Sequence, residues 1–166
     1  MRRACVLLLA SLAAPAWAGE AVFTFVDASG APVAVRGAAE PERALLLHFF
    51  ATWCSDCAAD LAHLAEASAG CDRARVLAID VGEDADVVAA YLAKHALRLP
   101  VLRDPEGDAW RRLDGRGLPA NAIWSAAGHR SEVGPKSREQ WLALLGGLGC
   151  RSGAGSPVIG VQEESP

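Results

Sequence analysis

The sequence lacks the features that mark several large functional classes. It has no cluster of basic residues, and its 16 Lys and Arg against 20 Asp and Glu give a formal net charge of -4. A mildly acidic chain without a basic patch is not expected to bind nucleic acid. No metal-ligand cluster, nucleotide-binding loop or hydrolase triad is evident in it. We therefore expect no nucleic-acid partner, no metal and no bound cofactor.

The chain also lacks internal repeats and any sign of a second domain. Its 166 residues are enough for one domain with a real core, and a composition of 52% hydrophobic and 22% charged residues is ordinary for a globular protein. After Cys150 the chain contains Gly, Ser and Pro without a strong period. We expect one folded domain over residues 19–150 and a flexible tail over residues 151–166.

The N-terminus has the pattern of a secretory signal peptide. Arg2 and Arg3 form a charged region, residues 5–14 form an apolar region, and residues 16–18 read Ala-Trp-Ala, a small-x-small cleavage site. The apolar run is shorter than the about 20 residues that a membrane span needs. We therefore expect residues 1–18 to be removed and the protein to be exported, for example to the periplasm. An uncleaved membrane anchor is the alternative.

Export changes how the cysteines are interpreted, because disulfides persist in oxidising compartments. Cys5 would leave with the signal peptide, and four cysteines would remain: Cys54, Cys57, Cys71 and Cys150. An even number is consistent with one redox-active pair and one structural pair.

The most informative stretch of the chain carries the first two of these cysteines. The apolar run at residues 44–50 predicts a buried strand, and the pattern at residues 58–64 predicts a helix. Cys54 and Cys57 lie between them with a spacing of three, so both thiols share one face of the first helical turn. A helix N-terminus favours a thiolate. A thiolate beside a second thiol is the least that thiol–disulfide exchange requires.

Residues 49–57, Phe-Phe-Ala-Thr-Trp-Cys-Ser-Asp-Cys, closely resemble the active site of thioredoxin-fold proteins, and in particular of the TlpA/ResA group of exported thiol–disulfide oxidoreductases. That group usually has Pro at the position of Asp56 and Trp at the position of Phe50. The resemblance extends over roughly residues 23–148. It implies an α/β, thioredoxin-like fold with a central mixed sheet, helices on both faces and an N-terminal β-hairpin extension.

The pattern along the chain agrees with that fold. Residues 21–26 and 31–35 predict the hairpin, and the apolar residues 75–81 predict a parallel strand beside the one before the cysteines. Further along we expect helices over residues 84–95, 108–113 and 137–148, a connection that starts at Leu99, a segment at residues 117–125 and an antiparallel strand over residues 129–133.

We assign the attacking thiol to Cys54, which is nearer to solvent, and the resolving thiol to Cys57. A purely structural disulfide is the alternative. Haem attachment would need a His in place of Ala58, and a structural zinc site would need a second ligand pair, which Cys71 and Cys150 do not form in the sequence. A peroxiredoxin would carry Pro and Thr where this chain has Leu47 and Ala51.

The resemblance also implies a second active-site element at Pro119. In thioredoxin-like proteins the equivalent proline is cis and packs against the disulfide, so that the backbone of Leu118 can pair with an extended partner segment. An ordinary loop with a trans proline is the alternative. Trp53 is expected to be a partly exposed aromatic side chain that contacts the partner, with simple packing as its alternative.

His48 lies six residues before Cys54, at the position of a buried acid in thioredoxin-like proteins. Our hypothesis is that it relays a proton to or from Cys57. The alternative is a half-buried histidine that bonds a backbone carbonyl. Asp56 opposes a second negative charge on Cys54 and so raises the expected thiol pKa relative to a proline version; a solvated carboxylate with little effect is equally compatible with the sequence.

Cys71 and Cys150 follow two helices that, in the thioredoxin fold, share one sheet face and one direction. We therefore predict a structural disulfide between them, closing a loop of about 80 residues and worth up to roughly 4 kcal/mol. Two free buried thiols are the alternative.

Together these features predict a monomeric, exported thiol–disulfide oxidoreductase that acts on client proteins through Cys54 and Cys57 without a cofactor. The resemblance favours a reductant that receives electrons from a membrane-embedded donor, and cytochrome c maturation is the best-known client pathway of such proteins. The alternatives are a disulfide-forming oxidase and a non-catalytic binding module that holds extended segments.

Overall fold

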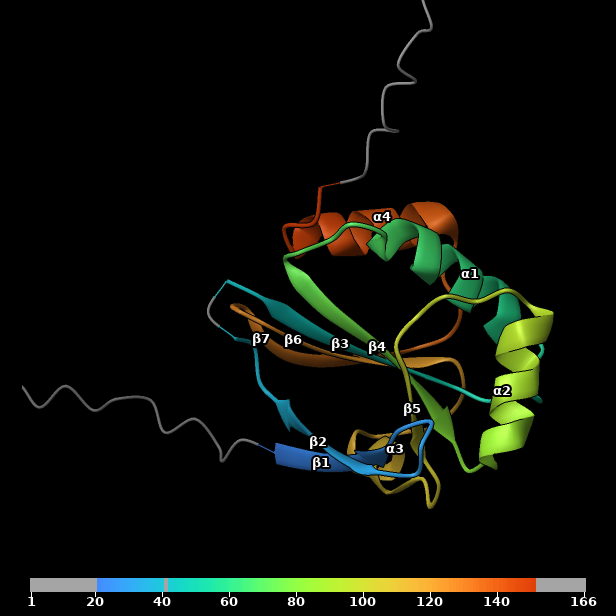
Figure 1. Ribbon diagram of the computed structural model, residues 1–166. Coiled ribbons are helices and arrows are strands. Elements are labelled where there is room, and N and C mark those ends of the chain that lie inside the picture. The colour runs from blue at the N-terminus through green and yellow to red at the C-terminus, as the bar shows by residue number, and fades with distance from the viewer. Residues whose placement is uncertain (1–20, 41, 152–166) are drawn as a thin grey trace, which may run out of the picture.

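The computed structural model describes residues 21–40 and 42–151 (Figure 1). The predicted signal peptide and all but the first residue of the predicted tail lie outside these residues. The chain forms eleven elements in this part: β1 (Ala21–Val26), β2 (Pro32–Gly37), β3 (Ala44–Phe50), α1 (Cys57–Ser68), β4 (Ala74–Val81), α2 (Ala85–Lys94), β5 (Val101–Asp104), α3 (Asp108–Arg112), β6 (Ala120–Ser125), β7 (Gly128–Val133) and α4 (Arg138–Gly147).

The strands form one mixed sheet in the order β2-β1-β5-β4-β3-β6-β7. Strands β3, β4 and β5 are parallel neighbours, whereas β6 and β7 return antiparallel on one side and the β1–β2 hairpin joins on the other. The central mixed sheet and the N-terminal hairpin predicted from the sequence are thus confirmed.

One strand was not predicted. The segment after Leu99 is a connection in the sequence-based interpretation, but residues 101–104 form β5 and pair in parallel with β4. Four residues are too few for a periodic pattern to be recognised, and this strand exists because the edge of β4 is available to pair with it.

Strand β3 lies inside the sheet between β4 and β6, and every one of its residues is buried. Side chains alternate along a strand, so Leu45, Leu47 and Phe49 pack on one face and Leu46, His48 and Phe50 on the other. His48 is the polar exception in this apolar run. The position of β3 therefore places one histidine in the interior of the protein.

Helices cover both faces of the sheet, as predicted. Helices α1 and α4 lie side by side on one face of the sheet (Figure 1). On this face Leu46 of β3 packs in one apolar cluster with Trp141 and Leu145 of α4. Helix α3 packs on the opposite face with the phenylalanines of β1. No helix within residues 21–40 and 42–151 has the length and apolar character needed to cross a bilayer.

Candidate active site

The two cysteines of the Cys-x-x-Cys motif meet at the beginning of α1. Cys57 is its first residue and is completely buried, whereas Cys54 is half-buried in the preceding turn. A disulfide joins them, with 5.4 Å between the two Cα atoms. The backbone N–H of Cys57 donates to the carbonyl of Cys54 at 3.2 Å. The turn therefore presents one sulfur towards solvent and keeps the other one behind it.

The side chains predicted to bind a partner gather around this turn. Trp53, directly before Cys54, is 71% exposed and is free to contact another protein. Leu118 packs, together with Cys54, against the apolar cluster that contains Cys57. The peptide bond between Leu118 and Pro119 is cis. The fold thus brings residues 65 positions apart in the sequence to one site.

Asp56, between the two cysteines, is exposed at the N-cap position of α1, and its side chain makes no capping hydrogen bond. Its carboxylate therefore lies close to the cysteines but does not cap the first turn of the helix.

His48 lies beneath the site in a fully buried position. Strands β3 and β6 pair so that His48 is opposite Asn121, and the ring Nδ1–H donates to the Asn121 Oδ1 at 2.9 Å. Burial lowers the pKa of His48 despite the opposing effects of Asp60 and of the hydrogen bond to Asn121, so the neutral ring is the stable form at neutral pH. The half-buried histidine bonded to a backbone carbonyl, given above as the alternative, is wrong in both respects.

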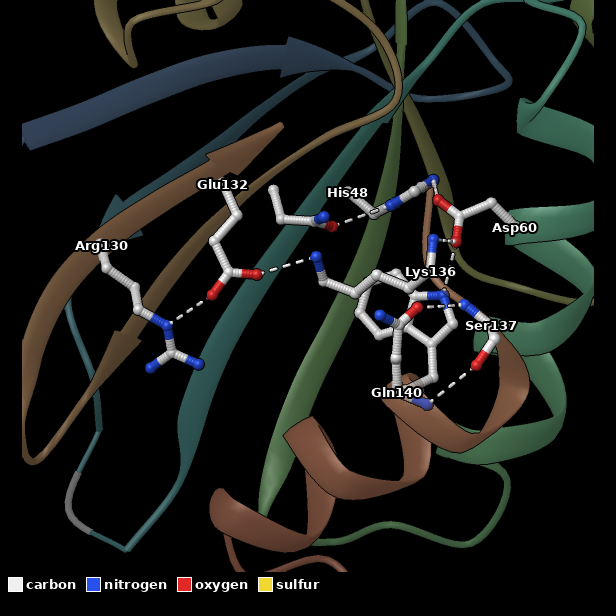
Figure 2. Close-up of polar contacts among 9 residues, drawn as sticks. His48, Asp60, Arg130, Glu132, Lys136, Ser137 and Gln140 are labelled. Atoms are coloured by element: carbon white, nitrogen blue, oxygen red, sulfur yellow. Dashed lines mark hydrogen bonds and ion pairs between the residues drawn. The ribbon is translucent and has the colours of Figure 1, made fainter. Parts of the chain in front are cut away.

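Asp60 is a site residue that the sequence did not reveal. It is buried on α1, three residues after Cys57 and therefore on the same helical face. Its Oδ1 accepts hydrogen bonds from the Trp141 indole at 2.6 Å and from the backbone N–H of Lys136 at 2.9 Å. Its Oδ2 lies 3.8 Å from His48 Nε2, and neither atom has another partner (Figure 2). The only available signal was an acidic residue in the apolar face of a helix.

A chain of ion pairs runs from this cluster to the surface (Figure 2). The Lys136 ammonium contacts Glu132 at 2.9 Å, and Glu132 contacts Arg130 at 2.9 Å. The next residue, Ser137, begins α4 with a capping box, in which its N–H donates to the Gln140 side chain at 2.7 Å. Asp60 is therefore bonded on both sides of this cap, to the backbone of Lys136 and to the indole of Trp141.

The other two cysteines lie at the opposite end of α1. Cys71 follows the helix and forms a disulfide with Cys150, 79 residues later, with 5.1 Å between the Cα atoms. Both pack with the apolar residues between α1, α4 and the sheet. The predicted pair is thus bonded in the structure, far along the helix from Cys57.

Within residues 21–40 and 42–151, no three His, Cys, Asp or Glu side chains are grouped so that they could hold a metal ion.

The sequence matches the AhpC/TSA family over residues 13–128. No curated protein matches it significantly.

Several solved structures of bacterial proteins are similar in fold to this chain. One is a secreted disulfide oxidoreductase of Mycobacterium tuberculosis, homologous to DsbE of E. coli, with a TM-score of 0.64 and 24% identity over 75% of this chain and 95% of that one. StoA from Bacillus subtilis has a TM-score of 0.62 and 18% identity over 76% and 98% of the two chains. A thiol:disulfide interchange protein of the thioredoxin family from Chlorobium tepidum has a TM-score of 0.60 and 23% identity over 81% and 99%. These structures confirm the thioredoxin-like fold.

Proposed function

The chain belongs to the AhpC/TSA family, and we propose that it is an exported thiol–disulfide oxidoreductase that reduces disulfides of client proteins. The observation that carries the proposal is the Cys54–Cys57 pair at the tip of α1, with one sulfur half-buried and the other fully buried beside an exposed tryptophan. The fold shared with thiol:disulfide interchange proteins supports it.

The difference in burial between Cys54 and Cys57 supports the following order of steps. In the reduced protein, the thiolate of Cys54 attacks one sulfur of a client disulfide, forms a mixed disulfide and releases the other client sulfur as a thiolate. The thiolate of Cys57 then attacks the Cys54 sulfur, which restores the Cys54–Cys57 disulfide and frees the second client thiol. The client gains two electrons and two protons, and the protein loses them.

The protein must then be reduced again by a dithiol donor. We propose a membrane-embedded donor protein, because the resemblance to the TlpA/ResA group favours a reductant. Trp53 and the backbone of Leu118 would contact the extended segment that carries the client disulfide. The N-terminal pattern of residues 1–18 supports export.

His48 and Asp60 are suitable for moving the proton of Cys57. Asp60 lies one helical turn from Cys57, and the neutral His48 ring has its Nε2 3.8 Å from Asp60. A proton released from Cys57 would reach the carboxylate first and the imidazole second. The pH profile of client reduction by the His48→Ala variant tests this path, and a profile equal to that of the wild type removes the relay.

The reduction potential of the Cys54/Cys57 pair tests the direction of electron flow. Equilibration with glutathione, followed by alkylation of free Cys54, gives this value. A potential near about -270 mV supports a reductant, whereas one near about -120 mV would identify a disulfide-forming oxidase. If the wild type exchanges no disulfide while a Cys54→Ser, Cys57→Ser variant still binds extended segments, the protein is a binding module.

A further inference from the structure

The turn that carries Cys54 is attached to the neighbouring strand as well as to its own helix. Strands β3 and β4 are parallel neighbours, with Phe50 opposite Asp80, so their carboxyl ends meet at one edge of the sheet. Thr52 lies two residues beyond β3, and Glu83 lies two residues beyond β4. The topology therefore places the loop before Cys54 beside the loop that contains Glu83.

The two loops are joined by two short hydrogen bonds. The backbone N–H of Thr52 donates to Glu83 Oε2 at 2.5 Å, and the Thr52 hydroxyl donates to Glu83 Oε1 at 2.5 Å. Hydrogen bonds to a carboxylate are stronger than those between neutral groups. Both oxygens of Glu83 are thus used to hold one residue, which is separated from Cys54 only by Trp53.

Glu83 is itself held by neighbouring elements. Its N–H donates to Asp80 Oδ1 at 3.2 Å, and its carbonyl accepts from the Arg103 guanidinium at 3.4 Å. Asp80 on β4 pairs with Arg103 on β5, so both arise from the sheet directly below. The position of the Glu83 backbone is therefore set by two strands of the core.

Ionisable side chains on β4 and α2 lie beside Glu83. Burial, followed by the side-chain hydrogen bond and the charge of Glu83, raises the pKa of Asp80 to about 8. The hydrogen bond from the Glu83 backbone N–H and the charge of Arg103 offset this only in part. Asp80 therefore keeps its proton at neutral pH. Tyr91 of α2 also lies near Glu83; burial and the charge of Glu83 raise its pKa, so it stays neutral.

We propose that Glu83 is a positioning residue for the Cys54–Cys57 pair: its carboxylate holds Thr52 and so fixes the backbone that presents Cys54 to the sulfur of a partner. The inference rests on the proposed exchange function. It assigns a role to a residue that touches neither sulfur and that lies 29 positions after Cys54 in the sequence. Positioning of a nucleophile matters because small displacements of reacting atoms slow a reaction strongly.

The test measures how fast dithiothreitol, a small dithiol, reduces the Cys54–Cys57 disulfide, read by alkylation of Cys54. We expect Glu83→Ala to react between about tenfold and a hundredfold more slowly than the wild type. Glu83→Gln should stay within about threefold, because its amide can accept from the Thr52 N–H and donate to the Thr52 hydroxyl. Recovery by glutamine separates positioning from an effect of charge.

Two further variants complete the experiment. Glu106 lies two residues beyond β5 as Glu83 lies two residues beyond β4, and it is exposed, so Glu106→Ala is the matched control and should react like the wild type. Thr52→Val removes one of the two bonds and should slow the reaction about fivefold. In the Glu83→Ala background, Thr52→Val should slow the reaction no further, because the carboxylate that accepts from the Thr52 hydroxyl is already absent.

Several outcomes would overturn the inference. If Glu83→Ala reacts like the wild type, or if Glu83→Gln is as slow as Glu83→Ala, Glu83 does not position the turn. If Glu83→Ala gives no cooperative thermal transition, that variant is not folded, and the rate of the Thr52→Val variant tests the inference instead. A Thr52→Val rate equal to that of the wild type would then refute the inference. A wild type that does not react at Cys54 at all would refute the proposed function and this inference with it.

Discussion

Helix α1 has a disulfide at each end, and the surroundings of the two ends differ. At its N-terminal end, Cys54 and Cys57 lie three residues apart, above the buried polar side chains of His48 and Asp60. At its C-terminal end, Cys71 and Cys150 lie 79 residues apart among apolar side chains such as Leu64 and Leu145. The same bond therefore closes a tight turn at one end and most of the domain at the other.

The difference separates function from stability. A disulfide that closes a short loop restricts the unfolded chain less than one that closes a long loop, so the Cys54–Cys57 bond can open with a smaller loss of stability. The ionisable side chains of His48 and Asp60 near it are buried, whereas those next to the other bond, such as Asp72 and Arg73, are exposed. We therefore expect changes at one end to alter reactivity and changes at the other to alter stability.

The largest effect on exchange is expected from loss of the attacking sulfur at the N-terminal end of α1. Cys54→Ser should lower the rate of disulfide exchange by about a thousandfold or more, because the attacking sulfur is lost. The double variant Cys71→Ser, Cys150→Ser should exchange within about twofold of the wild type when assayed where it is folded. Stopped-flow measurement of client reduction checks both, and residual activity of Cys54→Ser would assign the attack to another group.

The opposite end should dominate stability. Removal of the Cys71–Cys150 bond by the same double variant should lower the free energy of unfolding by about 4 kcal/mol, since the bond closes a loop of 79 residues. Opening the Cys54–Cys57 bond in a Cys57→Ser variant should cost about 2 kcal/mol. Denaturant unfolding of the three proteins compares the values, and equal losses would contradict the separation of roles.

A third prediction concerns Asp80, which lies beside Glu83 near the N-terminal end of α1. Folded Asp80 has a pKa of about 8, whereas the ordinary value is 3.8. Between these values the folded state binds more protons than the unfolded chain, so the free energy of unfolding should fall as the pH rises from about 4 to about 8. Asp80→Asn cannot ionise and should flatten this slope.

Urea unfolding over a pH series measures that slope. Asp72→Asn, at an exposed aspartate near the other end of the helix, is the control and should keep it. A slope in Asp80→Asn equal to that of the wild type would show that Asp80 is ionised in the folded protein.

The smallest expected effect concerns His48, and its contribution to stability changes with pH in the opposite direction to that of Asp80. Burial lowers its folded-state pKa from 6.5, so the unfolded chain binds the proton more readily. The stability contribution is present above about pH 6.5 and is lost as the pH falls through the lower folded pKa. His48→Asn should remove this loss, and His95→Ala, at an exposed position, should not. Thermal midpoints between pH 7 and pH 5 distinguish them.

Local signals allowed much of the site to be predicted. The apolar run before Cys54 and the helical pattern after Cys57 placed the turn, and the resemblance to thioredoxin-like proteins added Leu118 and Pro119. Asp60 and Glu83 were missed, because each looks like an ordinary acidic residue at a helix or loop position. Their partners, Trp141 and Thr52, lie 81 and 31 positions away in the sequence.

The spacing of two cysteines at the start of a helix and the apolar run that forms the buried strand β3 can be read from neighbouring residues, because helical period and local hydrophobicity set them. Which side chains meet beneath and beside the cysteines depends on the register between β3, β4 and β6, which pairs His48 with Asn121 and sets Phe50 beside Asp80. Only the folded sheet decides that register, since it results from hydrogen bonds between segments far apart in the chain. The pKa values of the buried histidine and aspartate follow from it, because burial and neighbouring charges exist only once the strands and helices have packed.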